Sequence, residues 1–148
     1  MTGAPDVRSA FTVERLEVTR VLVVEDDEET RALLCYLLRH DGMGCLEART
    51  GEEGVQLARE HHPDLILMDL QMPFLDGREA LALIRGDAAI AATPVVVLTV
   101  QDLSREDAVA GGFDGCMTKP IDPFTFNQEV AGFLPLRPLV DPAWTGTT

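Results

Sequence analysis

Four short runs rich in apolar residues divide the chain, and polar residues follow each of them. The runs span residues 21–24, 65–68, 94–98 and 115–118. A buried strand of a parallel sheet reads as such a continuous hydrophobic run bounded by turn residues. The pattern therefore predicts short buried strands of an α/β fold, with helices in the gaps between them.

Helical patterns fill those gaps, and several carry their own start signals. Thr50 and Glu53 have capping-box spacing, and Asp122-Pro123 reads as an N-cap followed by the first residue of a helix. Five βα units imply a parallel sheet with right-handed crossovers. The helices are expected at about 28–39, from Thr50 onward, at 77–85, between Ser104 and Gly111, and from Asp122 onward.

Carboxylates stand directly after two of the predicted strands. Glu25 and Asp26 follow the first run, and Asp69 follows the run at 65–68. Ligands of open α/β sheets sit outside the carboxyl ends of the strands, so these acids are placed where chemistry is expected. Three carboxylates at one edge repel one another, and a hard divalent cation such as Mg²⁺ is the usual remedy. We prefer a Mg²⁺ site over a solvated acidic cluster because two strand ends repeat the arrangement.

Two further strand ends supply a hydroxyl and an ammonium group. Thr99 follows the run at 94–98, and Lys119 follows the segment at 115–118. Each has an ordinary explanation, as a β-branched strand residue and as a surface charge before a proline. Together with three carboxylates they form a set suited to a phosphoryl group, because a metal and a lysine neutralise its oxygens while a threonine donates a hydrogen bond.

With these residues in place, the chain resembles the receiver domain of response regulators in two-component signalling. The resemblance covers about 20–134. It implies a doubly wound, flavodoxin-like sheet of five parallel strands in the order 2-1-3-4-5, flanked by five helices. The motifs that carry it are Val23-Val24-Glu25-Asp26-Asp27, Pro63 to Asp69, Met72-Pro73, Asp76-Gly77, Thr99 and Thr118-Lys119-Pro120.

The resemblance also implies a role for each site residue. Asp69 is the expected phosphoacceptor, Thr99 the switch hydroxyl and Lys119 the partner of the phosphoryl group. The expected Mg²⁺ ligands are the carboxylates of Glu25, Asp26 and Asp69, and the backbone carbonyl of Gln71. The implied protein catalyses only its own phosphorylation and dephosphorylation and is otherwise no enzyme.

Several positions depart from the family pattern and affect switching or gating. Cys116 stands where an aromatic ring is usual, so no ring can report the state of Thr99. Val100 stands where a smaller residue is usual and should narrow the approach to Asp69, and Gln101 flanks the same path. The spacing from Thr99 to Lys119 also predicts a short fourth helix. These changes cluster on the face formed by the fourth helix, the fifth strand and the fifth helix, where the resemblance places the partner-binding surface.

Composition limits the partners and the compartment. The 148 residues suffice for one domain with a core, and the net charge of −13 argues against nucleic acid or an anionic membrane as a direct ligand. No apolar run is long enough to cross a membrane, so no membrane insertion is expected. The three cysteines show no metal-like pairing, and a reduced, cytoplasmic compartment is expected.

We expect three segments: an N-terminal extension (1–19), the receiver domain (20–134) and a proline-containing C-terminal tail (135–148). No output domain is expected after the receiver, so the signal should leave through protein contact. The expected partners are a histidine kinase or histidine phosphotransfer protein and a downstream protein, with a homodimer left open.

We consider three functions for these residues. The first is a phosphoacceptor in a two-component system or phosphorelay, which takes its phosphoryl group from a phosphohistidine. The alternative is a phosphorylation-independent, receiver-like interaction scaffold, suggested by Val100 and Cys116. The third, a hydrolase of the haloacid dehalogenase kind, requires a second Asp two residues after the nucleophile, where this chain has Gln71. The intact acceptor set favours the first.

Overall fold

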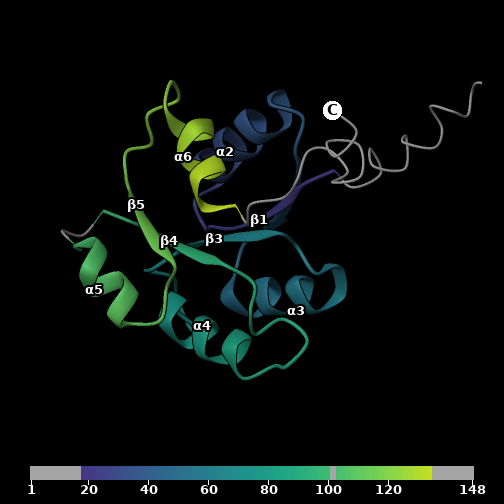
Figure 1. The fold of residues 1–148 in the computed structure, drawn as a ribbon, viewed down its shortest axis with the longest axis vertical. Coiled ribbons are helices and arrows are strands. Elements are labelled where there is room, and N and C mark those ends of the chain that lie inside the picture. The colour runs from purple at the N-terminus through teal and green to yellow at the C-terminus, as the bar shows by residue number, and fades with distance from the viewer. Residues whose placement is uncertain (1–17, 101–102, 135–148) are drawn as a thin grey trace, which may run out of the picture.

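A computed structural model of the chain describes residues 18–100 and 103–134. Its centre is a sheet of five parallel strands in the order β2-β1-β3-β4-β5, which confirms the predicted fold class (Figure 1). Each strand is only four or five residues long, as the short apolar runs predict. The strands are β1 (Arg20–Val24), β2 (Gly44–Ala48), β3 (Leu65–Asp69), β4 (Val95–Thr99) and β5 (Gly115–Thr118).

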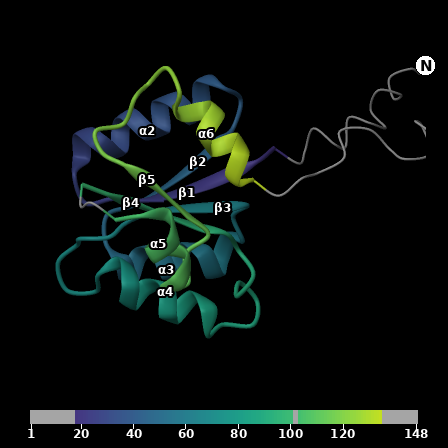
Figure 2. The same ribbon diagram turned by 60° about the vertical axis from the view of Figure 1, so that its left-hand side comes forward.

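Helices cover both faces of the sheet, so the molecule has three layers. In Figures 1 and 2, α2 and α6 lie on one face, and α3, α4 and α5 lie on the other. Among the helices of the described residues, α5 is the shortest, with six residues, as the spacing between Thr99 and Lys119 predicts. The helices are α2 (Glu28–His40), α3 (Gly51–His61), α4 (Gly77–Arg85), α5 (Arg105–Ala110) and α6 (Phe126–Phe133).

The two helical layers enclose two separate cores, because successive side chains of a strand point to opposite faces. In β1, Leu22 and Val24 belong to the core under α3 and α4, whereas Val21 and Val23 belong to the core under α2 and α6. The strand β3 divides in the same way. This burial on both faces explains why the strands are continuous apolar runs rather than alternating ones.

Most of the predicted helix starts are confirmed by their caps. The side chain of Thr50 accepts a hydrogen bond from the backbone N–H of Glu53, at 3.0 Å. Ser104 does the same for the N–H of Asp107, also at 3.0 Å. Each cap satisfies one of the backbone donors that a helix start leaves without a partner.

The predicted start of the last helix is wrong. Asp122 is not its N-cap, because the helix begins at Phe126 with Thr125 before it. The carboxylate of Asp122 instead accepts a hydrogen bond from the N–H of Phe124, at 2.9 Å. This local bond favours a turn ahead of the helix, and an Asp-Pro pair is compatible with a turn as well as with a cap.

The structure contains a disulfide that the sequence, with its expected reduced compartment, did not predict. A disulfide joins Cys35 of α2 to Cys45 of β2, and only Cys116 is a free thiol. The pair lies ten residues apart in the sequence, on a helix and on the strand that the helix packs against. Such a contact depends on how α2 is rotated on the sheet, which cysteine spacing alone does not reveal.

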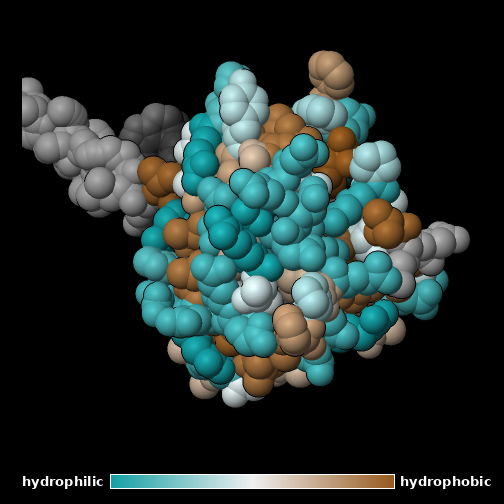
Figure 3. All heavy atoms as spheres, turned by 180° about the vertical axis from the view of Figure 1, so that it is seen from behind, coloured by the Kyte–Doolittle hydropathy of each residue, from teal (hydrophilic) through white to brown (hydrophobic). Residues whose placement is uncertain are grey.

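No helix among the residues that the structure describes is long and apolar enough to cross a membrane. The face drawn in Figure 3 is largely hydrophilic, and its hydrophobic residues lie in small separate groups. The expectations for the extension (1–19) and the tail (135–148) concern segments that fall almost entirely outside the described residues.

Candidate functional site

The sheet register brings the three predicted carboxylates together. β1 and β3 are adjacent, with Val24 beside Met68, so the residues that follow β1 lie next to the last residue of β3. Glu25, Asp26 and Asp69 each offer a carboxylate oxygen, and the three oxygens lie within 4.8 Å of one another. Glu25 and Asp69 are buried, whereas Asp26 is exposed to solvent. The site is therefore open on the side of Asp26.

Lys119 and Thr99 reach the same edge from β5 and β4. The ammonium of Lys119 lies 2.6 Å from Glu25 Oε1 and 3.6 Å from Asp69 Oδ2. The N–H of Lys119 donates to the carbonyl of Thr99, at 2.9 Å, which fixes the start of the β5–α6 loop against β4. Thr99 itself is buried. The side chains of Glu25, Asp69 and Lys119 thus meet at one edge of the sheet, and Thr99 ends the neighbouring strand β4 at the same edge.

Burial and repulsion from a neighbouring carboxylate disfavour the ionised form of Asp69. Desolvation is the main cause that raises the pKa of Asp69 to about 7, and the neighbouring Glu25 carboxylate adds to it. Lys119 and the N–H of Gln71 oppose this rise but do not cancel it. Burial would lower the pKa of Lys119, yet the two carboxylates outweigh burial and raise it. The lysine is therefore held as a cation, and the site has an excess of negative charge.

The donor set fits a hard divalent cation. All three side chains offer carboxylate oxygens, which are the ligands that Mg²⁺ prefers, and one exposed ligand leaves room for bound waters. The Lys119 ammonium contacts the carboxylates of Glu25 and Asp69, and Asp26 adds a third negative charge beside them. A further cation would relieve the repulsion from Glu25 that helps to raise the Asp69 pKa. The N–H of Gln71 donates to Asp69 Oδ1, at 3.2 Å, which orients that carboxylate from the loop that follows β3.

The predicted switch and gating residues have different positions. The side chain of Val100 is 66% exposed, so it is not packed into the core. Cys116 is half-buried on β5, and its Sγ contacts the carbonyl of Leu103 at 3.6 Å. Gln101 lies outside the described residues. Gating by Val100 and Gln101 and the altered switch at Cys116 stay predictions.

Sequence reasoning missed Arg31, a buried cation behind the site. Its guanidinium donates to the backbone carbonyl of Glu25 at 2.9 Å and to Glu47 Oε1 at 3.2 Å. Only 4% of Arg31 is exposed. The signal was present, because Arg31 shares the inward side of α2 with Leu34 and Leu38, where a charged residue is unusual.

Comparisons with known proteins identify the family to which the chain belongs. Residues 21–131 match the family model of the response regulator receiver domain. The chain is 34% identical to the polar-differentiation response regulator DivK of Brucella ovis over 116 residues, which are 77% of this chain and 94% of DivK. It is 35% identical to Protein PilH of Pseudomonas aeruginosa over 120 residues, 79% of this chain and 98% of PilH.

Solved structures show the same fold. The chemotaxis response regulator CheY4 of Vibrio cholerae superposes with a TM-score of 0.73 at 28% identity, and the match covers 79% of this chain and 99% of CheY4. The signal receiver domain of a histidine kinase from Syntrophus aciditrophicus gives a TM-score of 0.71 at 26% identity, over 85% of this chain and 99% of that domain. The chain belongs to the response regulator receiver family, whose members are signalling domains of two-component systems.

Proposed function

We propose that this protein is the phosphoacceptor of a two-component system or phosphorelay, with Asp69 as the residue that is phosphorylated. The observation that carries the proposal is the meeting of three carboxylates and Lys119 at the carboxyl edge of the sheet. The receiver unit spans 20–134. Signal enters from a histidine kinase or phosphotransfer protein and leaves through contact with a downstream protein, in the cytoplasm.

The transfer itself needs one bond formed and one broken. A carboxylate oxygen of Asp69 attacks phosphorus, the P–N bond to the donor imidazole breaks, and the imidazole leaves with a proton. Lys119 compensates negative charge on the incoming group, and the Thr99 hydroxyl donates to a phosphoryl oxygen. Glu25, Asp26, Asp69 and the carbonyl of Gln71 would hold Mg²⁺. When bound, the ion withdraws charge from the phosphoryl oxygens.

Exposed aromatic rings near the site support a protein as phosphoryl donor. Phe74, in the loop after β3, is 90% exposed, and Phe124, in the loop after β5, is 95% exposed. Both loops follow strands that end at the site. Exposed aromatic side chains are enriched at protein interfaces, where they supply much of the binding energy. A donor protein that approaches Asp69 would meet one or both rings.

The test is to incubate the full chain with Mg²⁺ and acetyl phosphate and to map the label by mass spectrometry. We expect one labile phosphoryl group on Asp69, and none after Asp69→Asn. Asp41→Asn, at an exposed carboxylate beyond the end of α2, is the matched control and should label normally. Absence of label in the wild type with Mg²⁺ would favour the interaction scaffold, and a label on another residue would refute the assignment.

A further inference from the structure

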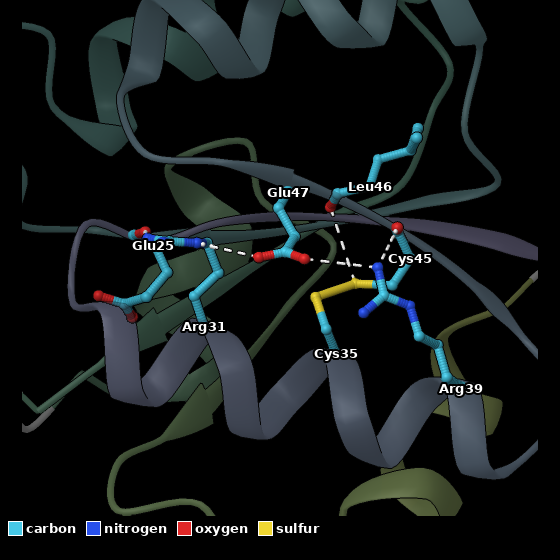
Figure 4. Close-up of a disulfide and its surroundings, with 7 residues drawn as sticks. All are labelled: Glu25, Arg31, Cys35, Arg39, Cys45, Leu46 and Glu47. Carbon is cyan, nitrogen blue, oxygen red and sulfur yellow. Dashed lines mark hydrogen bonds and ion pairs between the residues drawn. A yellow bond between two sulfur atoms is a disulfide. The ribbon is translucent and has the colours of Figure 1, made fainter.

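The disulfide lies between the edge strand of the sheet and the helix that starts beside the site. Cys35 is in the middle of α2 and Cys45 is on β2, with their Cα atoms 5.6 Å apart (Figure 4). Cys35 is buried and Cys45 is half-buried. Asp27, which caps the start of α2, follows directly after the acidic pair Glu25-Asp26. A covalent tie on α2 therefore acts on a helix that begins beside the site.

A polar chain runs from the disulfide to Glu25. Glu47 lies between two arginines of α2, with Arg31 at 3.2 Å and Arg39 at 3.4 Å (Figure 4). Arg39 also donates to the carbonyl of Cys45, at 3.1 Å. At its other end, Arg31 donates to the carbonyl of Glu25. The disulfide thus holds α2 on β2 in the position in which Arg31 contacts both the carbonyl of Glu25 and the carboxylate of Glu47.

The disulfide borders a cavity of about 430 Å³, which Cys35 helps to line, and Cys45 is half-buried. A small thiol that enters this cavity would approach the bond from the side of Cys35. Arg39 in its lining places a positive charge near the path by which a thiolate would enter, and such surroundings favour thiolate chemistry. The residues that line the cavity are Ala32, Cys35, Tyr36, Arg39, His40 and Glu47.

We propose that the Cys35–Cys45 bond is a reversible redox switch that sets the affinity of the acidic site for Mg²⁺. This inference rests on the proposed function. Disulfides in cytoplasmic proteins are usually transient and redox-sensing rather than structural. A disulfide in a cytoplasmic receiver is therefore expected to open and close with the redox state of its surroundings. Once the bond opens, α2 is held on β2 only by non-covalent contacts, and Arg31 positions the Glu25 backbone less firmly.

The chemistry is two-step thiol–disulfide exchange with a dithiol or with two thiols. A thiolate attacks one sulfur of the pair, the S–S bond breaks and the other cysteine leaves as a thiolate. A second thiolate then attacks the mixed disulfide and releases the second cysteine. The thiol donor is oxidised by two electrons to its own disulfide, and Cys35 and Cys45 are reduced. Re-oxidation by a small disulfide reverses both steps.

The experiment compares the oxidised full chain with the chain reduced by dithiothreitol. Alkylation with mass spectrometry should find one reactive thiol, Cys116, in the first state and three in the second. Calorimetry should find that reduction raises the dissociation constant for Mg²⁺ about threefold to tenfold. Mutation of a residue that hydrogen-bonds a metal ligand usually weakens metal affinity more than this. Cys116→Ser is the matched control and should leave that difference unchanged, since β5 and β2 are opposite edges of the sheet.

Two variants separate a positioning role from a merely structural one. Cys35→Ser should show the weaker Mg²⁺ affinity with and without reductant. Glu47→Gln keeps the disulfide but removes the negative charge between Arg31 and Arg39 and replaces one of the two acceptor oxygens with an NH₂ donor. Its Mg²⁺ affinity should therefore no longer depend on redox state. If Cys35→Ser fails to fold, the comparison of the two redox states of the wild type still decides the question.

The outcomes distinguish this inference from the proposed function. Equal Mg²⁺ affinity in the oxidised and reduced wild type overturns the coupling and leaves the phosphoacceptor proposal intact. Absence of Mg²⁺ binding in both states overturns the proposed function and the inference with it. A bond that stays closed in a large excess of reduced over oxidised glutathione overturns its reversibility, whatever the metal does.

Discussion

At the scale of single residues, the site combines groups that are unfavourable apart and useful together. Buried carboxylates are costly unless a cation accompanies them, and Lys119 supplies one positive charge against Glu25, Asp26 and Asp69. The cost appears in the pKa of Asp69, which burial and Glu25 raise to about 7. Buried charged residues do not stabilise the fold, and here they lie at the site where phosphoryl transfer is proposed.

Replacing Asp69 by Asn should stabilise the metal-free protein in a pH-dependent way. The ordinary pKa of 3.8 applies to the unfolded chain, so between about pH 4 and 7 the folded state binds more protons. The free energy of unfolding of the wild type therefore falls as pH rises through this window. Asp69→Asn has no carboxyl group to ionise, so it does not lose this stability. Urea unfolding should show Asp69→Asn more stable by roughly 1–3 kcal/mol at pH 8, and little different at pH 4. Equal effects at both pH values would contradict the pKa, and Asp41→Asn is the control.

Replacing Asp26 by Asn should abolish stabilisation by Mg²⁺. Asp26 is the exposed carboxylate of the cluster, so the change removes a ligand charge without disturbing the core. A ligand that binds only the folded state stabilises it by about 1.4 kcal/mol at ten times its dissociation constant. Thermal unfolding with and without Mg²⁺ measures this. A melting temperature that responds equally to Mg²⁺ in the variant and the wild type would remove Asp26 from the site.

At the scale of elements, the sheet edge positions the site and close packing of α4 fixes it. Gly77, the first residue of α4, donates its N–H to the carbonyl of Leu70, at 3.1 Å. A Cβ at this position would lie only 2.7 Å from the carbonyl oxygen of Asp69. The helix can therefore approach the end of β3 only because residue 77 has no side chain. The capping box of Asp76 and Glu79 holds the start of the helix at this distance.

Gly77→Ala should displace the end of β3 from α4 and disturb Asp69. Overpacking of this kind costs about 1–3 kcal/mol, and a shift of the acceptor should slow phosphorylation by acetyl phosphate. Gly132→Ala is the matched control, because a Cβ there meets nothing within 4 Å and alanine is the better helix former. The control should keep both rate and stability. An unchanged phosphorylation rate in Gly77→Ala would show that the site tolerates this displacement.

At the scale of the whole molecule, the sheet and the site residues were predictable, and contacts between distant elements were not. Apolar runs that end in Glu25, Asp69, Thr99 and Lys119 identify strands whose ends must meet once the sheet is parallel. Local spacing says nothing about the rotation of α2 on β2, which decides both the disulfide and the contacts of Arg31. The start of α6 was misjudged because Asp122 satisfies a turn as readily as a cap.

Substitution of Cys116 by Tyr should act on partners more than on chemistry. Cys116 lines an open cavity of about 620 Å³ between β5 and α6, away from the carboxylates. A tyrosine ring at this position changes the surface between β5 and α6, and the expected Mg²⁺ ligands, Asp69 among them, are unchanged. Sedimentation and partner binding should change, while the rate of labelling by acetyl phosphate stays within about twofold, or 0.4 kcal/mol. A change in labelling rate alone would contradict this prediction.

The short α5 gives this molecule an element that can unfold by itself. It has six residues and buries only Ala108, so little apolar surface holds it against the sheet. Segments with few buried contacts open locally at a free energy far below that of global unfolding. A protease should therefore cut within α5 before any other described helix, while β4 and the site stay folded. A partner that binds the unfolded α5 would then order this segment on binding, in the way that disordered segments fold on their partners.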